Sequence, residues 1–164
     1  TAALMVTHDA EEAMFMSDHI VVLRGGQVQQ TGRPVNLYCQ PNSAFVAEFF
    51  GEVNQIEGVV TNGKIETVLG TFAAPDSCSD GQDVQIVIRY EALNIEPDSA
   101  GANAEVMEAR LLGRASLIHL SVPTGTDELH LHARVPGLNS LPSGSQVRIT
   151  VDTSQAFVFP AVSG

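Results

Sequence analysis

The sequence predicts a mainly β protein in which a short α/β segment precedes a small β-barrel or sandwich. In the first fifty residues, apolar strand patterns alternate with stretches of helical spacing. After Gly51, short strand patterns recur with turn signals between them and no convincing helix, which is typical of a small barrel or sandwich. We therefore expect two units, residues 1–51 and residues 52–164.

The first unit is expected to run strand, helix, strand, strand, helix, helix. Its apolar run Leu4–Thr7 suits a strand buried on both faces of a parallel sheet. Asp9 and Glu12 have the spacing of a capping box, so a helix is expected to follow to about Ser17. The remaining expected elements are strands at 19–23 and 27–31 and helices at 34–40 and 43–50.

The chain starts at Thr1, inside the run that is expected to be a buried strand. Proteins seldom begin in the middle of such a strand, so we interpret the start as a truncation. A strand that lacks its neighbours exposes apolar edges, and such edges tend to pair with other chains. We therefore expect the fragment to dimerise.

The second unit is expected to consist of short strands separated by turns. Asp83–Tyr90 alternates apolar and polar residues, the pattern of a strand with one buried face. Glu96–Ala104 contains Pro97 and Gly101 and is expected to be a loop. The other expected strands are 53–60, 64–69, 105–112, 115–122, 129–135, 146–151 and 156–159.

Acidic residues outnumber basic residues by 19 to 8, which gives a formal net charge of −11. Such a surface repels phosphate backbones, and aromatic residues are scarce, so we expect no nucleic-acid partner. Cys39 and Cys78 form neither a CxxC pair nor a disulfide framework, which fits a reduced cytosolic protein. No apolar run approaches the about 18 residues of a membrane helix, and no signal peptide is visible.

The most informative segment is Val6-Thr7-His8-Asp9-Ala10-Glu11-Glu12-Ala13, followed by Ser17-Asp18-His19-Ile20 and a Gly-turn hairpin. It resembles the switch-histidine region of ABC-transporter ATPases, and the resemblance continues to Gly51. In importers of the sugar, polyamine, iron(III) and sulfate class, this stretch leads into a C-terminal regulatory domain. The resemblance implies that residues 1–51 are the C-terminal remnant of an ABC ATPase domain.

The resemblance identifies His8 as the switch histidine, the candidate catalytic and ATP-contacting residue. A parallel strand delivers its last residue to the sheet edge where ligands bind. A histidine there can donate a hydrogen bond to the γ-phosphate and help to position the attacking water. A lone histidine would more simply end a strand, but the full motif favours the catalytic role. Asp9 is expected to cap the helix.

ATP binding in this family requires a GxxxxGK[ST] loop. The single lysine, Lys64, lies between Gly63 and Ile65 and cannot belong to such a loop. We therefore expect ATP and Mg²⁺ to be used by the intact subunit, and no cofactor binding or ATP hydrolysis by the fragment alone.

Residues 53–160 resemble the transport-associated OB-type (TOBE) domain that follows these ATPases. The resemblance rests on Ile88-Arg89-Tyr90-Glu91, Leu111-Leu112-Gly113 and Val158-Phe159-Pro160. Tyr90 stands where the family usually has Pro, so the strand is expected to continue through it. An OB-like barrel with a regulatory and dimerisation role is therefore expected.

The resemblance also implies partners and a location. They are a second ATPase subunit in a homodimer and integral membrane permease subunits, at the inner face of the cell membrane, with iron(III), polyamine or a related solute as cargo. The alternative is a sensor of a small regulatory ligand, an oxyanion or the transported solute. Its candidate contacts are Arg89, Arg110, Arg114, Arg134 and Arg148.

Three histidines in neighbouring strands raise the question of a metal site. His130 and His132 share one strand face, and His119 lies on the adjacent predicted strand. Because Leu131 and Ala133 form the inward face, we expect these histidines to be solvated outside and to bind no metal. Glu11 and Glu12 are expected in the first turn of a helix, where the macrodipole favours acids, and not in catalysis.

Overall fold

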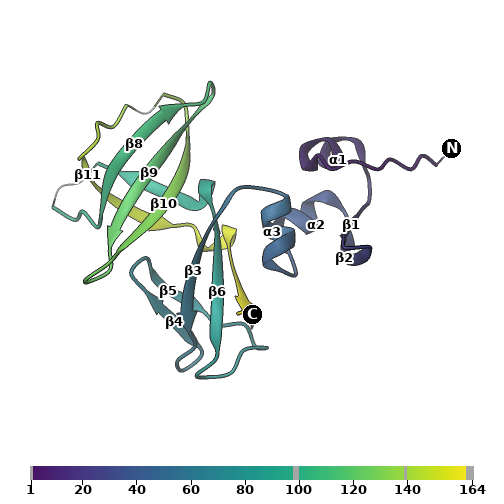
Figure 1. The fold of residues 1–164 in the computed structure, drawn as a ribbon, viewed down its shortest axis with the longest axis horizontal. Helices are drawn as coiled ribbons and strands as arrows, with labels where there is room; N and C mark the ends of the chain where they lie inside the picture. The colour runs from purple at the N-terminus through teal and green to yellow at the C-terminus, as the bar shows by residue number, and fades with distance from the viewer. Residues whose placement is uncertain (1, 98–99, 139, 162–164) are drawn as a thin grey trace. The chain divides into compact units, whose positions relative to one another are not determined.

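The computed structural model describes residues 2–97, 100–138 and 140–161. The chain divides into two compact units, Thr1–Glu52 and Val53–Gly164. The helices lie in the first unit and most strands lie in the second (Figure 1). Each unit has its own hydrophobic core, so each is described by itself.

The first unit packs three short helices on a β-hairpin. The helices are α1 (Ala10–Met16), α2 (Pro34–Cys39) and α3 (Ala44–Phe49), and the antiparallel hairpin joins β1 (Ile20–Arg24) to β2 (Gln27–Gly32). The predicted helices and hairpin strands are confirmed to within one or two residues. Ser43 caps α3, its hydroxyl accepting a hydrogen bond from the Val46 amide. The core consists of Ala13, Ile20, Val22, Leu37, Val46 and Phe50.

The strand expected at Leu4–Thr7 is absent, and this prediction is wrong. Residues 2–7 have no regular secondary structure, and the side chains of Leu4 and Val6 are 94% and 91% exposed. A strand forms only where a neighbour completes its hydrogen bonds. Among the described residues no strand pairs with this segment, so its apolar pattern alone does not produce one.

The second unit contains two antiparallel sheets and a separate hairpin. The five-stranded sheet has the order β10-β9-β8-β11-β7, the three-stranded sheet has the order β12-β6-β3, and β4 pairs with β5. The strands are β3 (Val53–Val59), β4 (Lys64–Thr67), β5 (Gly70–Ala73), β6 (Asp83–Arg89), β7 (Leu93–Glu96), β8 (Ala104–Leu111), β9 (Ala115–Pro123), β10 (Glu128–Pro136), β11 (Gln146–Val151) and β12 (Ala156–Pro160).

The core of this unit is built from strands in which buried and outward-facing side chains alternate. Along β9, Ile118, Leu120 and Val122 are buried, whereas Leu117 and His119, which alternate with them, face outward and are partly exposed. The same period of two recurs in β10 and β11, as expected for sheets with one buried face. The mainly β class is confirmed.

Three details of this unit differ from the sequence prediction. β6 does not continue through Tyr90 but ends at Arg89, where a 3₁₀ turn over Tyr90–Ala92 redirects the chain into β7. A hydrogen bond joins that turn to the C-terminal part of the sequence, because the Asp152 amide donates to the Ala92 carbonyl at 2.8 Å. The short strands β5 and β7 were not predicted at all.

Candidate functional site

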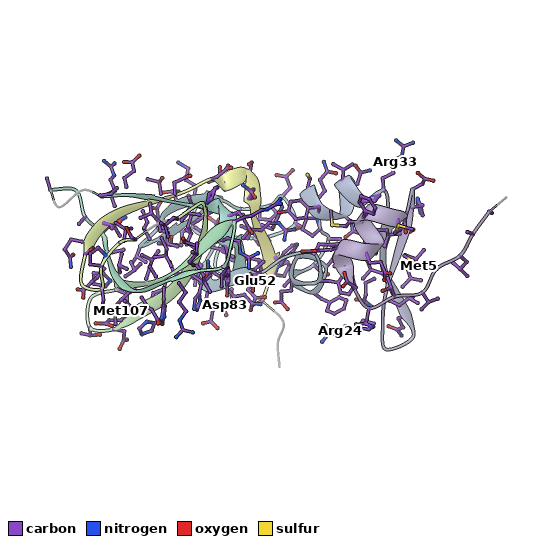
Figure 2. All side chains as sticks on the ribbon, turned by 90° about the horizontal axis from the view of Figure 1, so that it is seen from above. Met5, Arg24, Arg33, Glu52, Asp83 and Met107 are labelled. Carbon is purple, nitrogen blue, oxygen red and sulfur yellow. The ribbon has the colours of Figure 1, made fainter. Side chains whose placement is uncertain are left out.

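His8 lies at a bend between the extended N-terminal segment and α1, and its side chain is exposed. Figure 2 shows Met5 on the same segment, and its side chain is 41% exposed, compared with 94% and 91% for Leu4 and Val6. No hydrogen bond or ion pair of His8 occurs within the described residues. The structure therefore places the predicted catalytic residue at an accessible position, but it gathers no other predicted catalytic group around it.

The backbone on both sides of His8 is fixed by the first turn of α1. Asp9 Oδ1 accepts from the Glu12 amide at 2.9 Å, so the predicted helix cap is confirmed. Thr7 Oγ1 donates to Glu12 Oε2 at 2.6 Å and accepts from the Asp9 amide at 3.1 Å. The threonine hydroxyl therefore lies between the Asp9 amide and the Glu12 carboxylate, in place of the direct bond from the Asp9 amide to Glu12 that a capping box would have. Glu11 and Glu12 both lie in this first turn, as predicted.

The core of the first unit holds the helix that follows His8, and contacts between the hairpin and α3 stiffen that unit. Ala13 of α1 packs in the core of the first unit, and His19 Nε2 and Thr31 Oγ1 lie 2.8 Å apart across the hairpin. The guanidinium of Arg24 lies 4.7 Å from the centre of the Phe45 ring, a cation–π contact. This packing gives α1 a fixed support, so the position of His8 follows from the fold of the first unit.

A row of stacked rings lies on the outer face of β9 and β10. The ring centres of His119 and His132 are 4.6 Å apart with an angle of 11° between the planes, and His130 and Tyr90 extend the row at 5.4 and 5.3 Å. The prediction that these histidines face outward is confirmed. The ring of His132 stacks on those of His119 and Tyr90, whereas the rings of His119 and His130 are tilted by 53°. In the described part of the chain, no group of three or more His, Cys, Asp or Glu side chains is arranged to hold a metal ion.

The arginines expected for an oxyanion sensor lie on separate elements, and only Arg110 of β8 and Arg134 of β10 share a row, on either side of Leu117 of β9. Arg89 is fully buried, with its guanidinium 5.5 Å from the centre of the Phe157 ring. Arg110 Nε donates to Glu108 Oε1 at 2.8 Å, which lowers the pKa of that carboxyl and raises the pKa of Arg110. Both side chains also line a cavity of about 250 Å³. A carboxylate bound to the arginine in that cavity opposes the entry of an anion.

The helices of the described chain are short, and the longest, α1, has seven residues. None of them has the length and apolar character to cross a membrane.

A family model described as the TOBE domain matches residues 86–159. The chain is 38% identical to the sulfate/thiosulfate import ATP-binding protein of Chromobacterium violaceum over 163 residues, which cover 94% of this chain and 45% of that protein. It is 38% identical to the spermidine/putrescine import ATP-binding protein of Pseudomonas fluorescens, over 95% of this chain and 43% of that protein. It is 29% identical to the Fe(3+) ions import ATP-binding protein of Rhodococcus jostii, over 96% and 46%. The chain thus spans somewhat less than half the length of these relatives.

Among solved structures, the chain is similar to a cytoplasmic molybdate-binding protein. The TM-score is 0.50 at 15% sequence identity, and the similarity covers 66% of this chain and 96% of the other. At this identity the likeness concerns the fold alone, and it supports an OB-like fold for the β unit.

Proposed function

We propose that the chain is the regulatory and dimerisation portion of an ABC-importer ATP-binding subunit, because a TOBE-domain model matches residues 86–159 and relatives named as such subunits are 38% identical over most of the chain. In the intact subunit, ATP hydrolysis drives solute uptake through a membrane permease. The observation that carries this proposal is 38% identity across 94% of the chain, which extends through both units. The relatives are named for sulfate, polyamine and Fe(3+) import, so they do not single out one solute.

His8 is the residue of this chain that acts on ATP in the intact subunit. Its imidazole donates a hydrogen bond to a γ-phosphate oxygen of Mg-ATP and helps to position the attacking water. The exposure of His8 and the Thr7–Asp9–Glu12 network that fixes its backbone support this role. The remaining nucleotide-binding groups are supplied by segments other than those in this chain, because the chain contains no GxxxxGK[ST] loop.

The test uses the intact subunit reconstituted with its permease. We expect His8→Ala to lower the ATPase rate about 100-fold or more, the usual cost of removing one donor to a transition-state oxygen, while Mg-ATP affinity changes little. His19→Ala is the matched control, because His19 lies in the same unit and contacts Thr31 instead of a nucleotide. An H8A subunit that keeps most of its ATPase activity would refute the assignment.

A second copy of the subunit and the permease are the proposed partners, and they hold the protein at the inner face of the membrane. Several large apolar side chains of the first unit are exposed, Phe15 at 88%, and exposed apolar patches mark contact surfaces. The members of this set are Leu4, Met5, Val6, Phe15, Met16, Val21, Leu23, Val28 and Val35. Light scattering at low micromolar concentration tests the dimer, and a monomer alone would contradict it.

A further inference from the structure

Three hydrogen bonds surround the backbone of His8, and the His8 side chain takes no part in them. The Asp9 amide donates to Thr7 Oγ1 at 3.1 Å, Thr7 Oγ1 donates to Glu12 Oε2 at 2.6 Å, and the Glu12 amide donates to Asp9 Oδ1 at 2.9 Å. Each bond joins two members of the set Thr7, Asp9 and Glu12. The set therefore holds the chain on both sides of His8 and leaves the imidazole exposed.

The bond between the Asp9 amide and the Thr7 hydroxyl spans a single residue, which is His8. A Ser or Thr hydroxyl that accepts from the amide two positions later closes a local turn around the residue between them. Such a turn restricts the backbone angles of the enclosed residue, and those angles decide which side-chain rotamers it can adopt. The Thr7 hydroxyl thus limits the directions that the imidazole of His8 can take.

Glu12 sets the orientation of the Thr7 hydroxyl. A hydroxyl has one proton and two lone pairs, and its proton rotates to suit its partners. The Glu12 carboxylate takes that proton in a bond of 2.6 Å, a length expected for a hydroxyl that donates to a charged oxygen. A lone pair of the hydroxyl is then directed to the Asp9 amide. Without an acceptor at position 12, the proton is free to turn toward that amide and oppose the bond.

Glu12 is itself held by the helix α1. Its amide donates to the Asp9 side chain, and the next residue, Ala13, is buried in the core of the first unit, with its own amide donating to the Asp9 carbonyl at 3.1 Å. Glu11 lies in the same turn but forms no hydrogen bond or ion pair within the described residues. Of these two neighbouring glutamates, Glu12 reaches Thr7 and Glu11 does not.

We infer that Glu12 is a positioning residue for His8 and that it acts through the hydroxyl of Thr7. This inference rests on the proposed function, because it assigns a support to the histidine that contacts ATP. Glu12 itself touches no nucleotide: it orients the Thr7 hydroxyl, the hydroxyl holds the Asp9 amide, and the enclosed His8 keeps its imidazole directed at the γ-phosphate. Misplacing a reacting group by about 1 Å can lower a rate by about 100-fold, so the loss of such a support lowers kcat more than it weakens nucleotide binding.

The test measures the steady-state ATPase rate of the intact subunit reconstituted with its permease, and the melting temperature of each variant checks its folding. Glu12→Ala and Thr7→Val should each lower kcat about tenfold and change KM for ATP less than about twofold. Thr7→Ser keeps the hydroxyl and should retain most of the rate. Glu11→Ala is the matched control, because it removes a carboxylate from the same turn without touching Thr7, and it should leave kcat unchanged. Equal kcat values for Glu12→Ala and Glu11→Ala would overturn the inference.

A double-mutant cycle with His8 separates positioning from a merely structural role. If Glu12 acts through His8, Glu12→Ala should have no further effect on the residual rate of a subunit that already carries His8→Ala. An equal loss in both backgrounds would show that Glu12 acts independently of His8 and would overturn the inference. The two assignments also fail separately. A low rate in His8→Ala with an unchanged rate in Glu12→Ala contradicts this inference alone, whereas full activity in His8→Ala contradicts the proposed function and this inference together.

Discussion

The side chain of Asn54 pairs with the backbone of His132 through both of its polar atoms. Asn54 Nδ2 donates to the His132 carbonyl at 2.8 Å, and Asn54 Oδ1 accepts from the His132 amide at 2.8 Å. Asn54 lies on β3, an edge strand of the three-stranded sheet, and His132 lies on β10, an edge strand of the five-stranded sheet. The two sheets have no backbone pairing here. The Asn54 side chain makes the two hydrogen bonds to His132 that the backbone of a neighbouring strand would otherwise make.

Asn103 makes the same pair of hydrogen bonds at a second place where two strands lack backbone pairing. Its Nδ2 donates to the Ile149 carbonyl at 3.1 Å, and its Oδ1 accepts from the Ile149 amide at 2.7 Å. Asn103 immediately precedes β8, whose pairing with β11 covers only Ala104 and Glu105. Both asparagines therefore satisfy backbone groups that the sheets leave open, and buried backbone groups without partners are costly.

Asn54→Ala should destabilise the β unit by about 2–4 kcal/mol, because it leaves one amide and one carbonyl of His132 unsatisfied beside the core. Asn94→Ala removes an exposed asparagine of β7 and is the matched control, with an expected effect below about 0.5 kcal/mol. Urea unfolding followed by circular dichroism measures both. If the two variants unfold at the same midpoint, the bidentate contact does not stabilise the fold.

The turns of the β unit were predictable from the sequence, whereas its shortest strands were not. Asn62 and Gly63 have positive φ angles of 52° and 70°, the conformation that an Asn-Gly pair favours in a hairpin, so the turn between β3 and β4 was identifiable. The strand β7 owes its existence to pairing with β11, more than fifty residues later, as in Ile95 with Ile149. Four residues show too little alternation to reveal such a partner.

The candidate sites divide in the same way. His8 could be proposed because the motif around it is continuous in sequence, and Asp9 caps the helix as predicted. The contact of Tyr90 with His132 was not identified, because the two residues lie on different elements far apart in sequence. That contact arises only where folding brings the 3₁₀ turn after β6 beside β10.

Gly58→Ala should destabilise the β unit by about 1–3 kcal/mol, the usual cost of overpacking a core. A Cβ at Gly58 would collide with Cγ2 of Ile65, a side chain that is fully buried. Gly32→Ala is the control, because a Cβ there would meet its nearest neighbour, Leu37 Cδ2, at an ordinary 3.7 Å. Thermal unfolding monitored by calorimetry measures both, and equal melting temperatures would show that the close approach at Gly58 relaxes without cost.

Asp80→Ala should loosen the turn between β3 and β4. Asp80 Oδ2 accepts from the Asn62 amide at 3.0 Å and Oδ1 accepts from the Gly63 amide at 3.1 Å, so one carboxylate holds both central residues of the turn. At this exposed site we expect a loss of about 1 kcal/mol. We also expect faster hydrogen exchange of the Gly63 amide, measured by NMR. Asp76→Ala should leave that exchange unchanged, because Asp76 is an exposed carboxylate in the β5–β6 connection that also contains Asp80. Unchanged protection of Gly63 in Asp80→Ala would contradict this role.

Asp152 should make the acid stability of the β unit depend on its charge. The Ser154 hydroxyl, the Gln155 side-chain amide and the Ser154 backbone amide all donate to the Asp152 carboxylate, and these bonds lower its pKa. A carboxyl whose pKa is lower in the folded state stabilises the protein above the unfolded-state pKa of about 3.9, and this contribution is lost as the pH falls through the folded-state value. Asp152→Asn should therefore be less stable than the wild type at pH 7, and the difference should shrink as the pH falls below about 4. Urea titrations between pH 2 and 7 measure it, with Thr153→Ala as the neighbouring control, and a difference independent of pH would show that the charge of Asp152 does not contribute.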